Sequence, residues 1–425
     1  MIFRSFKISR YVLALLACLW ASAFEAFAGD IPLYAPVQEQ DPNKSFVKPP
    51  VKFGSFLLFS DITVGETYND NILAQETGAE SDFITTIAPT AQLVKSFGRH
   101  NFAVTAGAQG ARFVEHQDEN TLDYSGAFLG DIEVYHTFHI PLKLAYSLGH
   151  QGRTNRRLTS LTKNPVELTH KTAQSGFVYQ PNRLKLEFLG TYDQARVADS
   201  TLLVSGARVN ARDRAKNTLE LATTLSYETQ TSWKPIVKLI YNTEDYLRRT
   251  LTATGFDGIN RSNTTLRALA GIGFDYKGLL SGIILLGPEK HEYAEPAADP
   301  VKGFSADVVI KFSPSARTDG QFNFGKRSYD DNLLLSGLTE TTYGLALSHE
   351  LNARWSVNGK GSYSHTEFLS STRQDDEYAG SGSVVYNIQR GLALEGSYGY
   401  QTRESTAPSL SYDQSVVMLG LKNTF

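Results

Sequence analysis

Segments of about ten residues, in which apolar and polar side chains alternate, fill the chain from residue 57 to its last residue. In one of them Phe304 and Ala306 alternate with Ser305 and Asp307. Successive side chains of a strand point to opposite faces, so each segment has one apolar and one polar side. This pattern predicts an all-β protein with membrane-spanning strands, because a soluble sandwich uses shorter strands and a solenoid repeats at a fixed period.

Short turns and long polar stretches alternate between these segments. Outer-membrane barrels have short periplasmic turns and longer outer loops, and their strands are even in number. We therefore predict a transmembrane up-and-down antiparallel β-barrel of about 18 strands, with sixteen as the alternative, and both ends in the periplasm. The strands are expected to start near residues 57, 82, 101, 124, 142, 168, 183, 214, 235, 261, 280, 303, 320, 340, 354, 377, 391 and 412.

The N-terminus is typical of a secretory signal peptide. Basic residues precede an apolar stretch over 11–24, which is too short to span a membrane, and Ala26-Phe27-Ala28 is a small-x-small cleavage site. A lipoprotein box at Cys18, the only cysteine, is the alternative. We predict a signal peptide over 1–28, a proline-rich periplasmic tail or plug over 29–56 and the barrel over 57–425. The expected location is the outer membrane of a Gram-negative bacterium.

Composition and motifs exclude several classes of function. A net charge of -3 gives no sign of a nucleic-acid partner, and a hydrophobic share of 41% is too low for a helical membrane protein. We found no nucleophile elbow, zinc-binding helix motif or phosphate loop, so we predict no enzyme, metal or cofactor. The enzymatic alternative would use Ser125 with Asp123 and His136, or Ser364 with His365.

The C-terminus has the pattern of an assembly signal. The terminal Phe425 follows the alternating apolar residues Val417, Leu419 and Leu421. This arrangement resembles the signature that the outer-membrane barrel assembly machinery reads, although Asn423 departs from it. The assembly machinery is therefore a predicted partner, together with outer-membrane lipid and lipopolysaccharide.

A motif near the start of the barrel resembles the beta-barrel porin 2 family of Gram-negative outer membranes. The chain reads ETYNDNI over 66–72 and SDFIT over 81–85, followed by a proline; Thr90 stands where the family usually has glycine. The motif residues are Tyr68, Asp70, Asn71, Ser81, Asp82 and Pro89. Some members are encoded with exopolysaccharide or capsule secretion systems. The resemblance thus implies a conduit for polysaccharide, served by a periplasmic export complex, and it carries over no catalytic residue.

Part of this motif recurs over 328–334, where the chain reads SYDDNLL. We interpret both copies as a tyrosine at the membrane interface followed by Asp and Asn residues that start a turn. The alternative is an oxygen-rich calcium or sugar site at the mouth of the barrel, which would need both loops to converge.

The inside of the barrel is the predicted functional surface. A barrel of 16–18 strands leaves an aqueous channel. The mixed signs of its charges suit neutral or weakly charged solutes, and the basic loops 153–167 and 196–213 could meet acidic glycan or lipopolysaccharide phosphate. A general solute porin and a non-conducting structural or adhesive barrel are the alternative functions. The charged residues expected to line the lumen are Asp131, Glu133, Lys185, Glu187, Glu220, Glu228, Lys238, Arg267, Asp275, Asp307, Lys311, Glu350, Arg354, Lys360 and Glu395.

Overall fold

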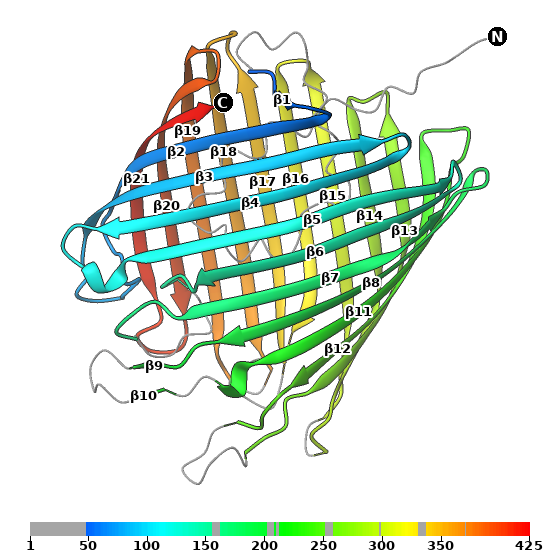
Figure 1. Ribbon diagram of the computed structural model, residues 1–425. Coiled ribbons are helices and arrows are strands. Elements are labelled where there is room, and N and C mark those ends of the chain that lie inside the picture. Colours follow the sequence, from blue (N-terminus) through cyan, green and yellow to red (C-terminus); the bar gives the residue numbers. More distant parts are fainter. Residues whose placement is uncertain are drawn as a thin grey trace.

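The chain forms a closed, all-β antiparallel barrel (Figure 1). The computed structural model describes residues 48–154, 162–201, 208–209, 212–250, 258–296, 299–329, 337–369 and 371–425. Nineteen strands belong to one sheet, and β1 (Val51–Phe53) pairs only with β2, so eighteen strands form the wall. The first wall strand closes the barrel on the last, because β2 pairs with β21 from Asp61 to Asn69. Within the described ranges, no helix is long and apolar enough to cross a membrane.

The strands follow one another around the barrel in chain order, apart from a short hairpin of β9 and β10 in one long loop. Two short 3-10 helices, η1 (Gln117–Glu119) and η2 (Arg212–Arg214), also lie in loops. The wall strands are β2 (Phe56–Asn69), β3 (Asp82–Phe97), β4 (His100–Phe113), β5 (Thr121–Tyr135), β6 (Phe138–His150), β7 (Glu167–Tyr179), β8 (Leu184–Val197), β11 (Lys216–Tyr227), β12 (Trp233–Tyr246), β13 (Asn263–Tyr276), β14 (Leu280–Tyr293), β15 (Val301–Ser315), β16 (Thr318–Tyr329), β17 (Leu338–Glu350), β18 (Trp355–Phe368), β19 (Gln374–Gln389), β20 (Leu392–Ser405) and β21 (Tyr412–Thr424); the hairpin comprises β9 (Ser200–Thr201) and β10 (Arg208–Val209).

The strand number and the alternation of short and long connections agree with the prediction. The largest error concerns β6, which was expected to start near residue 142 and begins at Phe138. Pro141 lies inside β6, at a point where the pairing with β7 is interrupted between His139 and Leu142. Proline has no backbone N–H group to donate and is therefore tolerated at such a break. The expected tail 29–56 overlaps β1 and the start of β2, and residues 1–47 lie outside the described part.

The two faces of the wall differ in character. Residues directly opposite in an antiparallel pair share a face. Leu219 lies opposite Tyr192 on β8 and Thr243 on β12, and Leu394 lies opposite Leu421 on β21. The face that these leucines share carries exposed apolar side chains on strand after strand, among them Val104, Leu144, Leu225, Leu345 and Tyr398. This face is the lipid-facing one, as in other outer-membrane barrels.

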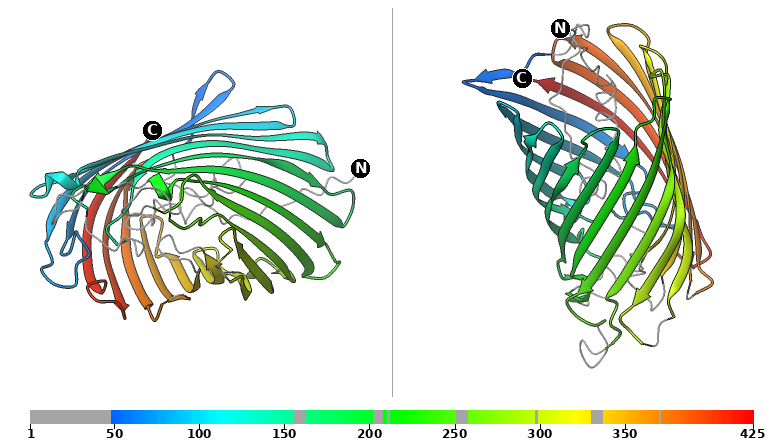
Figure 2. Two further views of the ribbon diagram at one scale, coloured as in Figure 1. Left: turned by 90° about the horizontal axis from the view of Figure 1, so that it is seen from below. Right: turned by 90° about the vertical axis from the view of Figure 1, so that its right-hand side faces the viewer.

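The barrel is flattened, and its wall bends sharply beside β12–β14 (Figure 2, left). There the inward side chains Ile240 and Leu269, which belong to β12 and β13, are almost fully buried in a small apolar cluster. Gly271 lies in β13, and Gly287 lies in the adjacent strand β14. A Cβ atom on Gly271 would lie 1.8 Å from the carbonyl oxygen of Ile284, and one on Gly287 would lie 1.9 Å from that of Ala268. The close approach of β13 and β14 therefore requires glycine at both positions.

Candidate functional site: the lumen and its outer mouth

Most of the charged residues expected in the lumen lie on the strand face opposite the lipid-facing one. Examples are Glu220, which neighbours Thr191 and Asn242 across the ladder, and Lys360, which lies opposite Ala346 and Ser381. Glu228 and Arg354 instead lie in the short turns after β11 and before β18. The strand positions on the inward face are Asp131, Glu133, Lys185, Glu187, Glu220, Lys238, Arg267, Asp275, Asp307, Lys311, Glu350, Lys360 and Glu395.

Two pairs of these charges lie close to each other, one on β8 and one between β13 and β15. Lys185 Nζ lies 2.9 Å from the Glu187 carboxylate. Asp307 accepts a hydrogen bond of 2.7 Å from Arg327, and its other oxygen lies 3.9 Å from Arg267. Neighbouring charges of opposite sign cancel most of each other's field at a distance. These parts of the lumen therefore present a mixed surface without a dominant sign.

The middle part of the inward face of β16–β20 is lined mainly by hydroxyl, amide and small side chains, and we call this middle part the neutral wall. Nearer the two ends of these strands the same face carries charges, namely Asp319, Arg327, Glu340, Glu350, Asp375, Glu377 and Arg403. The Ser348 hydroxyl donates to the Asn358 side-chain oxygen at 2.8 Å, and the Asn358 amide donates to Ser383 at 3.2 Å. Within the neutral wall, Lys360 and Glu395 are the charged residues among hydroxyl, amide and small side chains. The neutral wall comprises Gln321, Asn323, Thr342, Ser348, Asn358, Ser362, Ser364, Ser381, Ser383, Ser397 and Gln401.

The first half of the family motif joins the first long loop to the last strand. The Asn71 side chain is buried and donates to the carbonyl oxygens of Gln75 and Asp413 at 2.8 Å each. Gln414 donates back to the Asn71 carbonyl oxygen at 2.7 Å. The Asp70 carboxylate accepts the backbone N–H of Ser415 at 2.7 Å. These contacts hold the seam where β2 meets β21, so the motif residues Asp70 and Asn71 do more than start a local turn.

The second half of the motif ties the first long loop to the second. Asp82 is buried, and its carboxylate accepts the backbone N–H groups of Val114, Glu115 and His116 at 2.8–3.2 Å. The His116 ring also lies 3.0 Å from Asp82 and 2.6 Å from Glu80. We call Asp70, Asn71, Asp82 and His116 the clasp.

The contribution of the clasp to stability depends on pH, because His116 titrates. Partial burial alone would lower the pKa of His116, but its ring contacts with Asp82 and Glu80, and their charges, outweigh burial and raise it. A histidine whose folded pKa is raised stabilises the folded state below its unfolded pKa. That contribution is lost as the pH rises through the folded pKa.

The remaining motif residues have simpler places. Tyr68 and Phe83 lie on the lipid-facing side with their ring centroids 5.1 Å apart. Pro89 lies in β3 opposite Ile62, and Ser81 is exposed. The second copy of the motif falls largely on 330–336, outside the described residues. No group of three or more His, Cys, Asp or Glu side chains that could hold a metal ion occurs in the described part of the chain.

The third long loop lies against the inner wall at the outer mouth. Arg153, at its start, forms an ion pair with Glu119 of η1, and both side chains are buried. Arg403 reaches from the inward face of β20 to donate to the Thr154 carbonyl oxygen at 2.8 Å. Its guanidinium group also lies 4.7 Å from the centre of the Tyr412 ring. These contacts join β20 to the start of the loop that leaves β6, at residues 153–154.

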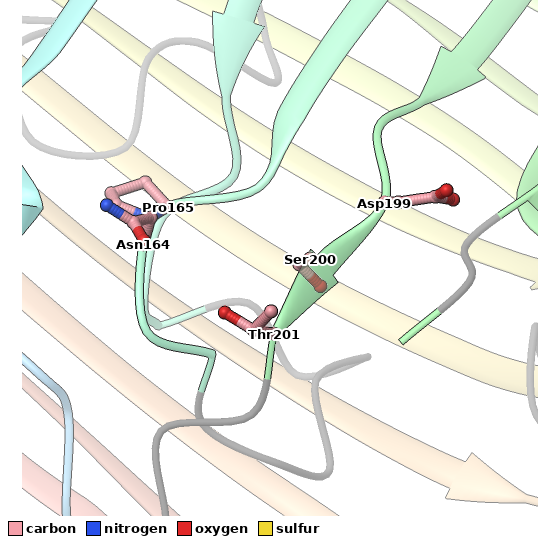
Figure 3. A pocket seen from close by; sticks show the side chains of 5 residues that line it. All are labelled: Asn164, Pro165, Asp199, Ser200 and Thr201. Atoms are coloured by element: carbon pink, nitrogen blue, oxygen red, sulfur yellow. The ribbon is translucent and has the colours of Figure 1, made fainter. Parts of the chain in front are cut away.

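Some basic residues of the outer loops have partners within the chain. Besides the buried Arg153, Lys163 lies 3.7 Å from Asp118, and Arg196 lies on the outward face of β8, where it donates to Asn217 at 2.8 Å. Arg156 and Arg157 fall outside the described residues. A small pocket lies where the third and fourth long loops meet, and its lining contains no basic side chain; it is formed by Asn164, Pro165, Asp199, Ser200 and Thr201 (Figure 3).

The two candidate catalytic groups are not assembled. Asp123 lies 2.6 Å from His150 and not beside His136, which lies in the short turn after β5 next to Glu133. His365 contacts Asp376 on the lipid-facing side, whereas Ser364 faces inward on the neutral wall. Geometry therefore gives neither serine a histidine partner.

Comparison with known proteins identifies the class. A family model described as "Putative beta-barrel porin 2" matches residues 50–425, and the chain belongs to this family. The structure resembles the copper transporter OprC, with a TM-score of 0.50, 10% identity and coverage of 89% of this chain and 82% of that one. It also resembles the siderophore receptor PiuA of Acinetobacter baumannii, with a TM-score of 0.50, 9% identity and coverage of 88% and 82%. No protein with a curated description matches in sequence.

These findings place the chain in the Gram-negative outer membrane as a porin-like barrel. The likeness to solved structures concerns the fold alone, because the sequence identities are about a tenth.

Proposed function

We propose that the barrel is a conduit for an exopolysaccharide or capsular polysaccharide, received from a periplasmic export complex. The observation that carries this proposal is the neutral wall. Sugar hydroxyl groups both donate and accept hydrogen bonds, and serine hydroxyls and Asn and Gln amides can exchange such bonds along a moving chain. A path through lipid would leave those hydroxyls without partners.

The position of the aromatic residues is consistent with a lumen along which a polysaccharide slides without being retained. Ser362 and Ser381 are exposed on the neutral wall, while aromatic rings such as Tyr378 and Tyr398 lie on the opposite, lipid-facing side. A sugar stacked on an aromatic ring would bind more tightly than one that meets hydroxyl groups alone. A hydroxyl-lined wall therefore favours passage over retention.

We expect the mature chain to conduct ions in planar lipid bilayers, and neutral dextran fragments to reduce that current reversibly. Replacing Ser362 and Ser381 with Asp should weaken the dextran block roughly fivefold, because two hydrogen-bonding positions become charged and strongly hydrated. The matched control replaces Ser125 and Ser147 with Asp. These serines are also inward-facing and lie opposite one another on β5 and β6, and the block should stay near the wild-type value.

Two outcomes would contradict the proposal. A chain that carries no current, even after deletion of residues 29–47, would be a structural or adhesive barrel. Conductance that dextran fragments never reduce, together with passage of small solutes, would indicate a general porin.

A further inference from the structure

Three neighbouring strands each change from apolar residues to a lysine on the lipid-facing side toward their long-loop ends; Lys290 pairs with Lys302, and Lys326 pairs with Ala306, four residues along β15 from Lys302. Pro288 is followed on this face by Lys290 in β14, Phe304 is preceded by Lys302 in β15, and Phe324 is followed by Lys326 in β16. We call Lys290, Lys302 and Lys326 the lysine row. It lies toward the long-loop end of the barrel, which is the outer end in proteins of this class.

The lysine row is unfavourable in the isolated barrel. Lys290 and Lys302 are directly opposite each other in the β14–β15 ladder. Like charges in such a pair repel and destabilise the sheet. Lys290 also contacts Glu292, but Lys302 and Lys326 form no ion pair with any residue that the structure describes. An anion between these strands would remove the repulsion.

The surroundings of the row define that anion. Below it, the outward face of β14–β16 is apolar and includes Leu286, Phe304 and Phe324. A ligand that contacts both the apolar face and the lysine row needs acyl chains beside the apolar side chains and negative charge beside the lysines. Lysine binds phosphate as a point charge. The flanking strands place uncharged residues beside these lysines: Leu266 of β13 lies opposite Lys290, and Thr341 of β17 lies opposite Lys326.

We propose that the lysine row binds the phosphorylated headgroup of a lipopolysaccharide molecule in the outer leaflet, with its acyl chains lying along β14–β16. The proposal concerns the outside of the barrel and does not depend on what passes through the lumen. It assigns the anionic glycolipid contact to the wall rather than to the basic loops, two of whose arginines, Arg153 and Arg196, have partners within the chain.

The test measures binding of diphosphoryl lipid A to the purified full-length barrel in detergent by native mass spectrometry. Replacing Lys290, Lys302 and Lys326 with Gln should weaken binding at least tenfold, because each lysine near a charged lipid surface contributes measurably. The control replaces Lys52, Lys95 and Lys277 at the short-turn end with Gln, which changes the net charge equally. Binding of this control should stay within about twofold of the wild type.

A second measurement needs no variant. Wild-type barrel should bind lipid A lacking both phosphates at least tenfold more weakly than the phosphorylated form. Inorganic phosphate should leave lipid A binding nearly unchanged, because it lacks the acyl chains. Equal affinity for the two lipids, wild-type binding by the triple variant, or full displacement by inorganic phosphate would each overturn the proposal.

Discussion

Replacing Asp82 with alanine should reduce the free energy of unfolding by about 3–5 kcal/mol, the scale of a buried charge network that loses one partner. The carboxylate accepts backbone N–H groups from Val114, Glu115 and His116 and lies 3.0 Å from the His116 ring. Its removal leaves the backbone N–H groups of Glu115 and His116 without their acceptor and weakens the connection between the first two long loops. Urea unfolding of the barrel in lipid vesicles, followed by tryptophan fluorescence, measures the effect.

The control for this prediction is Ser81→Ala, because Ser81 is the exposed neighbour of Asp82 in the same motif. Its free energy of unfolding should stay within about 0.5 kcal/mol of the wild type. If Asp82→Ala were as stable as this control, the clasp would have no structural role.

Replacing Val417, Leu419 and Leu421 together with Asp, or deleting Phe425, should abolish insertion into the membrane. The three side chains are 51%, 58% and 42% exposed on the lipid-facing side of β21. A carboxylate on this face costs up to a few kcal/mol near the midplane, though less than Arg or Lys. Leu419 also lies opposite Glu66 on β2, so its replacement would place two carboxylates together at the seam.

The matched control places Asp on the other face of the same strand, at Val416 and Met418, which face inward. We expect this variant to insert and to keep heat-modifiable migration on gels, since its carboxylates meet water in the lumen. Normal heat-modifiable migration of the outward triple variant, or of the chain without Phe425, would contradict the assembly role of the C-terminus.

The sequence was sufficient to predict the strands of the barrel wall, because each strand has its own alternation of apolar and polar residues. Alternation in β15 separates Phe304 and Ala306 from Ser305 and Asp307 without knowledge of any partner strand. Turn positions were less certain, because they depend on local breaks. Proline is disfavoured inside a strand, yet β6 contains Pro141, and its ladder with β7 omits the pairs at Ile140 and Pro141.

The clasp and the mouth could not be predicted from the sequence because their contacts join distant parts of the chain. Asn71 meets Asp413 and Gln414 only when the first strand closes on the last. The contact between Arg403 and Thr154 likewise joins β20 to the start of the loop that leaves β6. A local sequence pattern indicates that Asn and Asp favour turns, but it does not reveal which strand they hold.

The sharp bend at β12–β14 could not be predicted from the sequence either. Inward positions were expected to be polar, whereas Ile240 and Leu269 form an apolar cluster there. Their burial follows from the convergence of inward side chains at the bend, which Gly271 and Gly287 permit. Glycines in a strand can mark such an approach, but their number in this chain, 34, gave no way to single out these two.

The most direct test of the proposed conduit is the amount of polysaccharide on the cell surface after the gene is deleted and then restored. We predict that deletion removes the polymer from the surface while it accumulates in the periplasm, and that the wild-type chain restores it. Polymer at its normal level on the surface of the deletion strain, together with impaired uptake of small solutes, would contradict the account and assign the barrel to the general porins.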